Sequence, residues 1–227
     1  MRDRFPPGPS LLQRYAAVFP AVEINSSFYR PHRPATYARW AASVPDSFRF
    51  SVKLPRSVTH EGRLVATEPP LAEFLEQVGA LGERLGVILV QLPPSLAFDC
   101  RVAGLFFDDL RGRYAGMVAC EPRHLSWFDD EADALLRANR VARVAADPAL
   151  VDEAGRPGGW TGLAYWRLHG SPRRYYSAYS AEELVRLAGE IGGVADEAWC
   201  IFDNTAAGAA TGQALDLVAR CQGTGLS

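Results

Sequence analysis

The sequence predicts an α/β protein, and within that class a TIM-barrel-like (β/α) barrel. Seven short apolar runs rich in β-branched and aromatic residues recur along the chain, helix-period segments lie between most of them, and no stretch has the composition of a linker. Strands that alternate with helices are typical of parallel sheets joined by right-handed crossovers. A length of 227 residues suits one domain, so we expect a single (β/α)-barrel domain over residues 1–227.

The predicted strands are parallel, and most are bounded by residues typical of turns or helix caps. They are Ala21–Phe28, Phe48–Leu54, Val87–Leu92, Met117–Glu121, Val141–Ala146, Leu163–His169 and Ala198–Asp203.

Each predicted helix begins at a residue that favours a helix start. Ser10 is expected to cap a helix through about Phe19, and Ser180, with Glu183 three residues later, forms a capping box for a helix through Ile191. The other helices are predicted to begin at Pro34, at Pro69 or Pro70, at Asp99, at Ser126 or Asp129, and at Thr205.

Two irregularities interrupt this pattern. Residues 147–160, where a sixth helix is expected, have the composition of a loop. The chain also begins with a helix, so the barrel is expected to lack its first β-strand and to contain seven parallel strands. An open doubly wound sheet is the alternative, but it normally has a glycine-rich phosphate turn after its first strand, and this sequence has none.

The composition limits the partners that this protein is expected to bind and its expected location in the cell. The formal net charge of -2 gives no global attraction to nucleic acid or to anionic membranes. The four cysteines are widely spaced, the N-terminus has no apolar signal core, and no apolar stretch is long enough to span a bilayer. We therefore expect a soluble protein of the cytoplasm that does not contact a membrane.

Polar residues at the ends of the predicted strands form the candidate site, because barrel enzymes build their sites from strand carboxyl ends and the loops after them. Glu23 and Asn25 share one strand face, as do Glu121 and Arg123, and Arg167 and His169. Buried charges need partners, so we expect one compensating network. The predicted members of this network are Glu23, Lys53, Glu121, Arg167 and Asp203. These five residues and His169 are the predicted catalytic residues.

The segment Arg167–Tyr179 follows the penultimate strand, which is the frequent phosphate-binding position in such barrels. Ser171, Arg173 and Arg174 can donate to an anion, and Tyr175, Tyr176 and Tyr179 offer flat surfaces for a sugar or a base. The predicted substrate-binding residues are Asn25, Arg56, His60, Gln91, Arg123, His124, Ser171, Arg173, Tyr175, Tyr176 and Asn204.

No cofactor is required by the sequence, and no metal ligands are assigned. His60, His124 and His169, with Glu121, Asp147 and Asp203, offer enough ligands for a divalent metal, but no paired motif of the HExxH kind brings them together. Lys53 is the only lysine among the 24 lysine and arginine residues. It is interpreted as a partner for an anion or carboxylate, with an imine-forming role as the alternative.

The strand-end motifs also resemble a known family. VEINSSFYR (Val22–Arg30), FRFSVKLPRSVTH (Phe48–His60), LVQLPPSLAFD (Leu89–Asp99), CEPRHLSWF (Cys120–Phe128), YWRLHGSPRRYYSAY (Tyr165–Tyr179) and WCIFDNTAAGAA (Trp199–Ala210) are similar to the YecE-like family, also called domain of unknown function 72. The resemblance runs from about Ser10 to Ala219. It implies a TIM-barrel-like fold and no established reaction.

This chain departs from that resemblance at its start. Family members have a first strand with a GTSGW-like end before the first helix, and this sequence lacks it, so the chain is expected to be N-terminally truncated relative to the family. The missing strand leaves two barrel edges unpaired, which predicts self-association through those edges.

Our leading hypothesis is an enzyme that acts on a small anionic or phosphorylated, sugar-like substrate by general acid/base chemistry at the C-terminal face of the barrel. Glu121 or Glu23 would be the acid or base, Lys53, Arg167 and Arg123 would stabilise negative charge, and His169 would transfer protons. Hydrolase, isomerase and lyase chemistry fit equally. The alternatives are a metal-dependent phosphodiesterase resembling a nuclease, and a non-catalytic protein that binds a ligand or nucleic acid.

Overall fold

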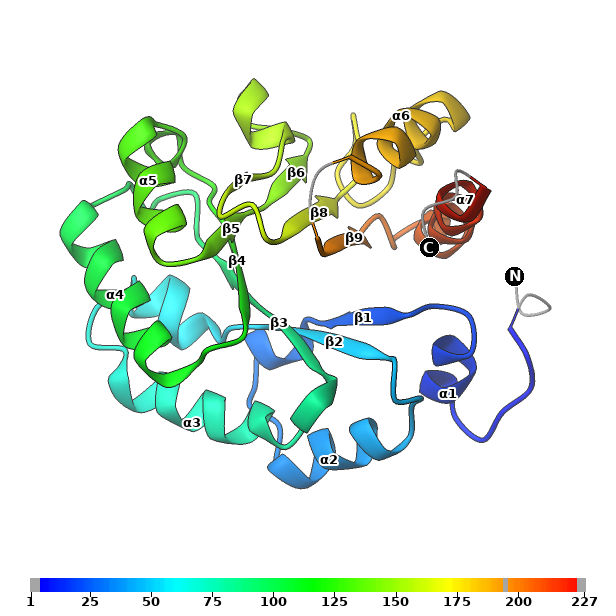
Figure 1. Ribbon diagram of the computed structural model, residues 1–227, viewed down its shortest axis with the longest axis horizontal. Helices are drawn as coiled ribbons and strands as arrows, with labels where there is room; N and C mark the ends of the chain where they lie inside the picture. Colours follow the sequence, from blue (N-terminus) through cyan, green and yellow to red (C-terminus); the bar gives the residue numbers. More distant parts are fainter. Residues whose placement is uncertain (1–4, 194–195, 224–227) are drawn as a thin grey trace. The chain divides into compact units, whose positions relative to one another are not determined.

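The protein has a mixed α/β fold with mostly parallel strands (Figure 1). A computed structural model describes residues 5–193 and 196–223. The chain forms two compact units, Met1–Val118 and Ala119–Ser227.

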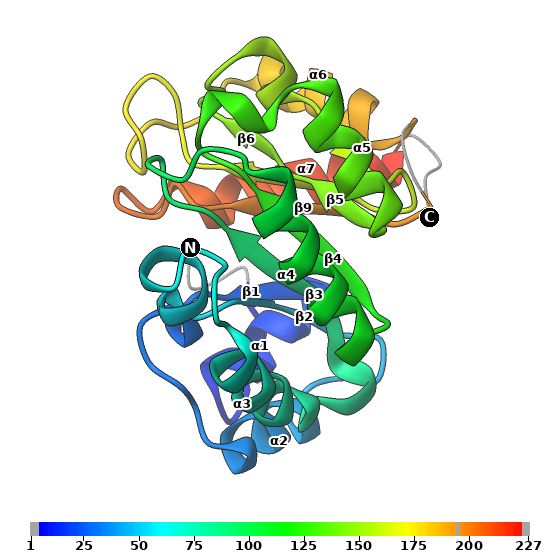
Figure 2. The ribbon, with the colours of Figure 1, turned by 90° about the vertical axis from the view of Figure 1, so that its left-hand side faces the viewer.

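The first unit contains three parallel strands in the order β1-β2-β3. Glu23 lies opposite Ser51, and Lys53 lies opposite Leu89. Helices α2 and α3 lie on one side of these strands in both views (Figures 1 and 2). The elements are α1 (Leu11–Ala16), β1 (Ala21–Ile24), α2 (Pro34–Ala42), β2 (Arg49–Lys53), α3 (Glu68–Gly79), β3 (Leu85–Gln91) and α4 (Cys100–Arg113).

A second set of parallel strands, in the order β6-β8-β9, belongs to the second unit. Its apolar core contains Ala145, Trp166 and Leu168 from the strands, together with Leu187 of α6 and Leu217 of α7. The elements from the junction of the units onward are β4 (Met117–Glu121), α5 (Asp130–Ala138), β5 (Val141–Arg143), β6 (Ala145–Asp147), β7 (Gly158–Gly159), β8 (Ala164–Leu168), α6 (Ala181–Ile191), β9 (Ala198–Phe202) and α7 (Ala209–Gly223).

Several predicted helix starts are confirmed by the caps. The side chains of Ser10, Asp99 and Asp129 each accept a hydrogen bond from a backbone N–H of the first turn of α1, α4 and α5. Ser180 and Glu183 form both bonds of the predicted capping box, at 3.2 and 2.6 Å. These bonds satisfy backbone donors that a helix start otherwise leaves unpaired.

The prediction that Thr205 opens the last helix is wrong, because α7 begins at Ala209. The Gly208 N–H donates to the Thr205 carbonyl in a turn, and Gly208 has a φ of +75°. A right-handed helix cannot run through that conformation.

The predicted strand Val141–Ala146 is divided into β5 and β6 at Val144. The Val144 N–H donates to the carbonyl of Cys120 in β4 at 2.8 Å, and β6 pairs with β8. The segment 147–160, predicted to be a loop, contains a short helical turn, Asp152–Gly155, and the two-residue strand β7, which pairs antiparallel with β5.

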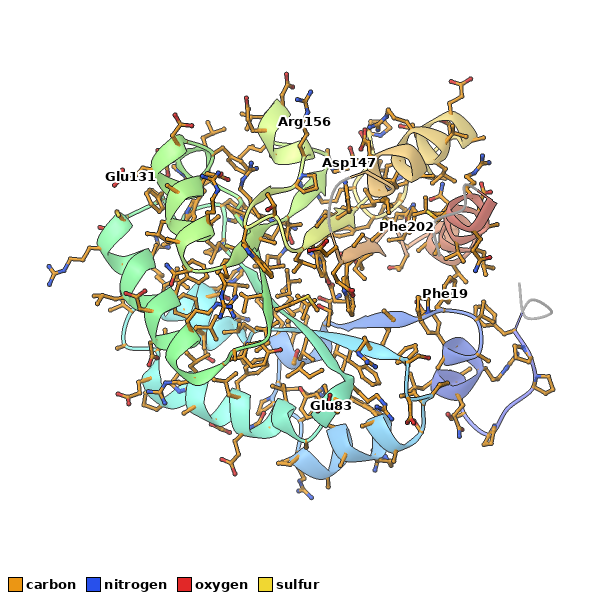
Figure 3. The ribbon with its side chains drawn as sticks, viewed as in Figure 1. Phe19, Glu83, Glu131, Asp147, Arg156 and Phe202 are labelled. Carbon is orange, nitrogen blue, oxygen red and sulfur yellow. The ribbon has the colours of Figure 1, made fainter. Side chains whose placement is uncertain are left out.

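Within each unit, side chains fill the space between the helices and strands, whereas the exposed side chain of Glu131 points away from α5 (Figure 3). Among the described residues, no helix combines the length and the apolar character needed to cross a bilayer.

Candidate functional site

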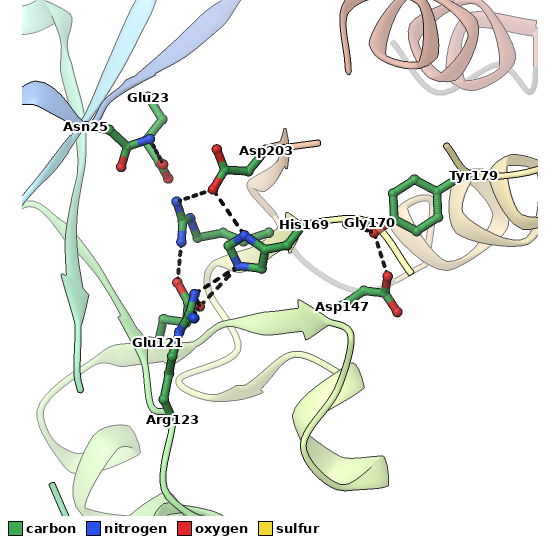
Figure 4. A network of polar contacts seen from close by, with 10 residues as sticks. Glu23, Asn25, Glu121, Arg123, Asp147, His169, Gly170, Tyr179 and Asp203 are labelled. Carbon is green, nitrogen blue, oxygen red and sulfur yellow. Dashed lines mark hydrogen bonds and ion pairs between the residues drawn. The ribbon is translucent and has the colours of Figure 1, made fainter. Parts of the chain in front are cut away.

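Five titratable side chains at the ends of β4, β8 and β9 contact one another within the second unit (Figure 4). Glu121 is the last residue of β4, Arg167 lies near the end of β8, and His169 and Asp203 directly follow β8 and β9. Together with Arg123 they form what we call the strand-end network. It contains two guanidinium groups and two carboxylates, so its formal charges balance when His169 is neutral.

The alternation of side chains along β8 explains how this network forms. Trp166 and Leu168 are members of the apolar core with residues of α6 and α7. Successive side chains on a strand point to opposite faces, so Arg167 and His169 face away from those helices. Both contact Glu121, which confirms the prediction that they share a face.

Glu121 is the centre of the network. Its Oε2 accepts a hydrogen bond from Nη1 of Arg167 at 2.5 Å. Its Oε1 accepts from Nε and Nη2 of Arg123 at 2.9 and 2.6 Å. The side chains of Glu121 and Arg167 are each only 1% exposed. Charge-assisted bonds of this kind are strong in a buried environment, and they fix both oxygens of the carboxylate.

These cations keep Glu121 ionised. Burial alone raises the pKa of the Glu121 carboxyl, but Arg167, the hydrogen bond with His169 and Arg123 more than offset burial and hold the pKa well below its ordinary value. A carboxylate that holds a proton so weakly is poorly matched to proton transfer near neutral pH. The expected role of Glu121 as a general acid or base therefore gains no support from the geometry.

His169 lies between two carboxylates. Its Nδ1 is 3.1 Å from Oδ2 of Asp203, and a carboxylate can only accept, so Nδ1 carries a proton. Its Nε2 is 3.2 Å from Nη2 of Arg123 and 3.3 Å from Oε1 of Glu121. Neutral His169 accepts from Arg123 at Nε2, whereas protonated His169 donates to Glu121. The site thus offers a partner for each protonation state of the imidazole.

Only two members of the network reach solvent appreciably. The side chain of Asp203 is 25% exposed and that of Arg123 is 16% exposed. Burial raises the pKa of Asp203, but the hydrogen bond with His169 and the charge of Arg167, at 3.5 Å from Oδ2, together lower it below its ordinary value. The network therefore exposes part of one carboxylate and part of one guanidinium to solvent, whereas its other side chains are buried.

Asp147, at the end of β6, holds the chain immediately after His169. Its backbone carbonyl accepts from the His169 N–H at 2.8 Å. Its Oδ2 accepts from the Tyr179 hydroxyl at 2.5 Å, and that hydroxyl accepts from the Gly170 N–H at 2.8 Å (Figure 4). Burial, and then the bond with Asp147, raise the pKa of Tyr179, so the hydroxyl keeps its proton. Tyr179 was expected to offer a stacking surface. Its hydroxyl instead joins the Asp147 carboxylate to the Gly170 N–H, and we call this pair of hydrogen bonds the Tyr179 clamp.

The loop between β8 and α6 carries the remaining predicted ligand-binding residues of this unit. Tyr175 contacts the His169 ring edge-on at 5.9 Å, and the Arg173 guanidinium lies over the Tyr176 ring at 3.9 Å. Ser171 is half-buried, and Arg173, Tyr175 and Tyr176 are exposed. The anion-binding role predicted for this loop stays a prediction.

The first unit contains the other predicted site residues. Asn25 donates to Oε1 of Glu23 at 2.8 Å, which confirms that the two share a face. The ammonium of Lys53 lies 3.9 Å from the centroid of Phe28, and His60 contacts the same ring at 4.8 Å.

Arg56 forms an exposed ion pair with Glu61, and Gln91 is buried at the end of β3. The membership of Glu23 and Lys53 in one network with Glu121 stays a prediction.

Two predicted substrate-binding residues have local structural contacts. His124 caps a short helical turn, Leu125–Trp127, by accepting from the Ser126 N–H. Asn204 is fully buried and donates to the Ser177 carbonyl and to Gln213. Sequence reasoning missed Ser177 and Gln213, which hold Asn204 and the loop, because an isolated serine or glutamine carries no motif signal.

Glu121, Asp147, His169 and Asp203 are four of the six residues that the sequence offered as metal ligands. Both oxygens of Glu121 are bound by guanidinium groups, and Asp147 is bound by Tyr179. Over residues 5–193 and 196–223, no group of three or more His, Cys, Asp or Glu side chains is arranged to hold a metal ion.

These features define a mixed α/β protein with a buried, charge-balanced cluster at the carboxyl ends of parallel strands. Its sequence matches the family described as "Protein of unknown function DUF72" over residues 4–226. The chain belongs to this family, as its strand-end motifs predicted.

Curated relatives agree with this assignment. The chain is 31% identical over 156 residues to the UPF0759 protein YecE of Escherichia coli K12, a match that covers 66% of this chain and 56% of that protein. It is 29% identical over 128 residues to the UPF0759 protein YunF of Bacillus subtilis 168, covering 52% of this chain and 44% of that protein. The chain thus matches about half the length of these relatives.

Solved structures of the same family share the fold. A DUF72 family protein of Thermotoga maritima MSB8 is similar with a TM-score of 0.78 and 28% identity, and the match covers 93% of this chain and 88% of that one. A DUF72 family protein of Enterococcus faecalis V583 is similar with a TM-score of 0.80 and 22% identity, covering 94% and 88%. No reaction or ligand is named for any of these proteins.

Proposed function

We propose that this protein is an enzyme that acts on a small anionic, sugar-like substrate by acid–base chemistry at the strand-end network, on a TIM-barrel-like (β/α) fold. One observation carries the proposal: His169 has a carboxylate on Nδ1 and both a cation and a carboxylate beside Nε2. A histidine oriented by a carboxylate is the usual arrangement for a general base.

His169 is the proton-transfer group in this proposal. It takes a proton from the substrate at Nε2 and returns it to the product. Asp203 orients the ring through Nδ1 and stabilises the imidazolium, and Glu121 accepts from Nε2–H once the proton has been taken. This assignment moves the acid–base role from Glu121 to His169, because Glu121 is bound by two arginines.

Arg123 is the group that meets the substrate's negative charge. It is the more exposed of the two arginines, and its Nη2 lies 3.2 Å from Nε2 of His169. When Arg123 turns to an anionic substrate, it releases the lone pair of Nε2 for proton transfer. Arg167 stays buried on Glu121 and Asp203, where it offsets their charge.

A thermal-shift panel tests this proposal. Sugar phosphates, sugar acids and neutral sugars are added at fixed ionic strength to wild type, Arg123→Gln and Arg156→Gln. Arg156 is an exposed arginine of the same unit and serves as the matched control. A bound anion at 100 times its dissociation constant stabilises the protein by about 2.7 kcal/mol, which corresponds to a rise in Tm of roughly 5–11 °C.

The expected result is stabilisation by an anionic compound that Arg123→Gln loses and Arg156→Gln keeps. Equal stabilisation by neutral sugars, or equal loss in both variants, would contradict the proposal.

A further inference from the structure

The loop between β8 and α6 is held firmly although its side chains are exposed. Ser177 accepts from the Arg173 N–H through Oγ at 3.0 Å and from Asn204 Nδ2 through its carbonyl at 2.9 Å. The Tyr175 carbonyl accepts from the Ala206 N–H at 3.1 Å, and Tyr179 anchors Gly170. Tyr175 and Tyr176 nevertheless remain 42% and 47% exposed. Ordered backbone that displays aromatic side chains to solvent is typical of a binding surface.

Tyr175 has a strained backbone that directs its ring to the strand-end network. Its φ is +68°, a left-handed conformation that is uncommon for a residue with a bulky side chain. Its N–H donates to the His169 carbonyl, and its ring contacts the His169 ring edge-on. Strain of this kind persists only where the surrounding structure imposes it, and it is concentrated at functional sites.

Arg173 is positioned by an aromatic ring and has no carboxylate partner among the described residues. Its guanidinium stacks on Tyr176 at 3.9 Å. In the described part of the chain, Arg173 forms no ion pair with a carboxylate. A guanidinium that stacks through its face keeps its N–H edge available, and that edge matches the geometry of a phosphate group.

We propose that Arg173, stacked on Tyr176, binds the phosphate group of a phosphorylated sugar-like ligand, and that Tyr175 packs against the sugar beside His169. The proposal rests on the proposed function for its choice of a sugar-like ligand. It goes further in naming a phosphate monoester as the anionic group. Arg174, the next residue, is exposed and adds a second positive charge to the same loop.

Binding of two probes tests this subsite without any measurement of turnover. Inorganic phosphate and glucose-6-phosphate are titrated by 31P NMR line broadening, with sodium chloride keeping the ionic strength constant. The proteins are wild type, Arg173→Gln, Arg156→Gln, Tyr175→Gly and Arg123→Gln. We expect Arg173→Gln to weaken binding of both probes about tenfold or more, because it removes a charge-assisted contact. The Arg156→Gln control should bind like wild type.

The variant Tyr175→Gly shows whether the Tyr175 side chain contacts the ligand or only supports the fold. Glycine accepts a φ of +68° without strain, so the variant should keep or raise its Tm, bind inorganic phosphate like wild type and bind glucose-6-phosphate more weakly. A lower Tm together with unchanged glucose-6-phosphate binding would overturn the role of Tyr175.

The outcomes distinguish the two proposals. Binding that depends on Arg173 and not on Arg156 supports the subsite, even when no conversion of any compound is found. Binding that Arg123→Gln abolishes and Arg173→Gln leaves unchanged overturns the subsite and leaves the proposed function standing. Equal weakening in Arg173→Gln and Arg156→Gln shows a nonspecific charge effect and also overturns the subsite.

Discussion

Glu121→Gln removes one charge from the centre of the strand-end network and should destabilise the fold strongly. Both Glu121 and Arg167 are buried, and removing one partner of a buried ion pair typically costs about 3–5 kcal/mol. Asp203 lies 3.5 Å from Nη2 of Arg167 and retains part of the compensation, so we expect the lower end, about 3 kcal/mol. For a chain of this size the Tm should fall by roughly 6–12 °C.

Urea unfolding at pH 7, followed by tryptophan fluorescence, measures this change. Trp127 and Trp166 are buried in the second unit and report its unfolding. Glu153→Gln is the matched control, because Glu153 is an exposed carboxylate of the same unit, and surface substitutions usually change stability by less than about 0.5 kcal/mol. A loss of stability in Glu121→Gln that is no larger than this control would refute the buried ion-pair account.

The pH dependence gives an independent check on the same variant. The pKa of Glu121 is lower in the folded state than its ordinary value of 4.5. The folded state therefore gains stability from this group above pH 4.5 and loses it as the pH falls through the lowered pKa. The difference in stability between wild type and Glu121→Gln should be full at pH 7 and should shrink as the pH drops below about 4.5. A difference that is the same at pH 7 and at pH 3 would contradict the depressed pKa.

Variants at three further positions test the local structure by urea unfolding. Tyr179→Phe leaves the Gly170 N–H and Asp147 without their shared hydroxyl and should cost about 1–3 kcal/mol; a change below 0.5 kcal/mol would argue against the clamp. Gly170→Ala places a Cβ 2.7 Å from the Ser177 carbonyl at a φ of +91°, so it should destabilise by more than about 1 kcal/mol, and wild-type stability would show that the loop can move aside. Ser180→Ala removes half of the capping box on α6 and should cost about 1 kcal/mol, while Ser180→Asn should recover most of it.

The positions of the second unit's site residues were predictable because two simple rules place them. Parallel strands end at one edge of a sheet, and alternate residues share a face. These rules brought Arg167 and His169 together with Glu121, and the need to pair buried charge added Asp203. Most members of this network could therefore be predicted from the acidic and basic residues at the strand ends.

Other features depend on tertiary contacts that have no local signal. The division of β5 from β6 at Val144 follows from a hydrogen bond to Cys120, which is distant in sequence. The bond from Tyr179 to Asp147 joins residues 32 positions apart, and neither residue type indicates a clamp. The stacking of Lys53 on Phe28 was also unforeseen, because residue types show charge but not the ring beneath it.

The central claim is that the strand-end network performs acid–base chemistry on an anionic compound, and one measurement tests it most directly. The measurement is proton NMR in D2O of each anionic compound that stabilises the protein, incubated with wild type, His169→Gln and Asp203→Asn. Wild type should convert one of these compounds or exchange one of its C–H protons for deuterium. His169→Gln should slow that reaction by about 10²–10⁴-fold, and Asp203→Asn should slow it while binding persists. Conversion at wild-type rate in His169→Gln, or no conversion and no exchange of any stabilising compound by wild type, would contradict the account.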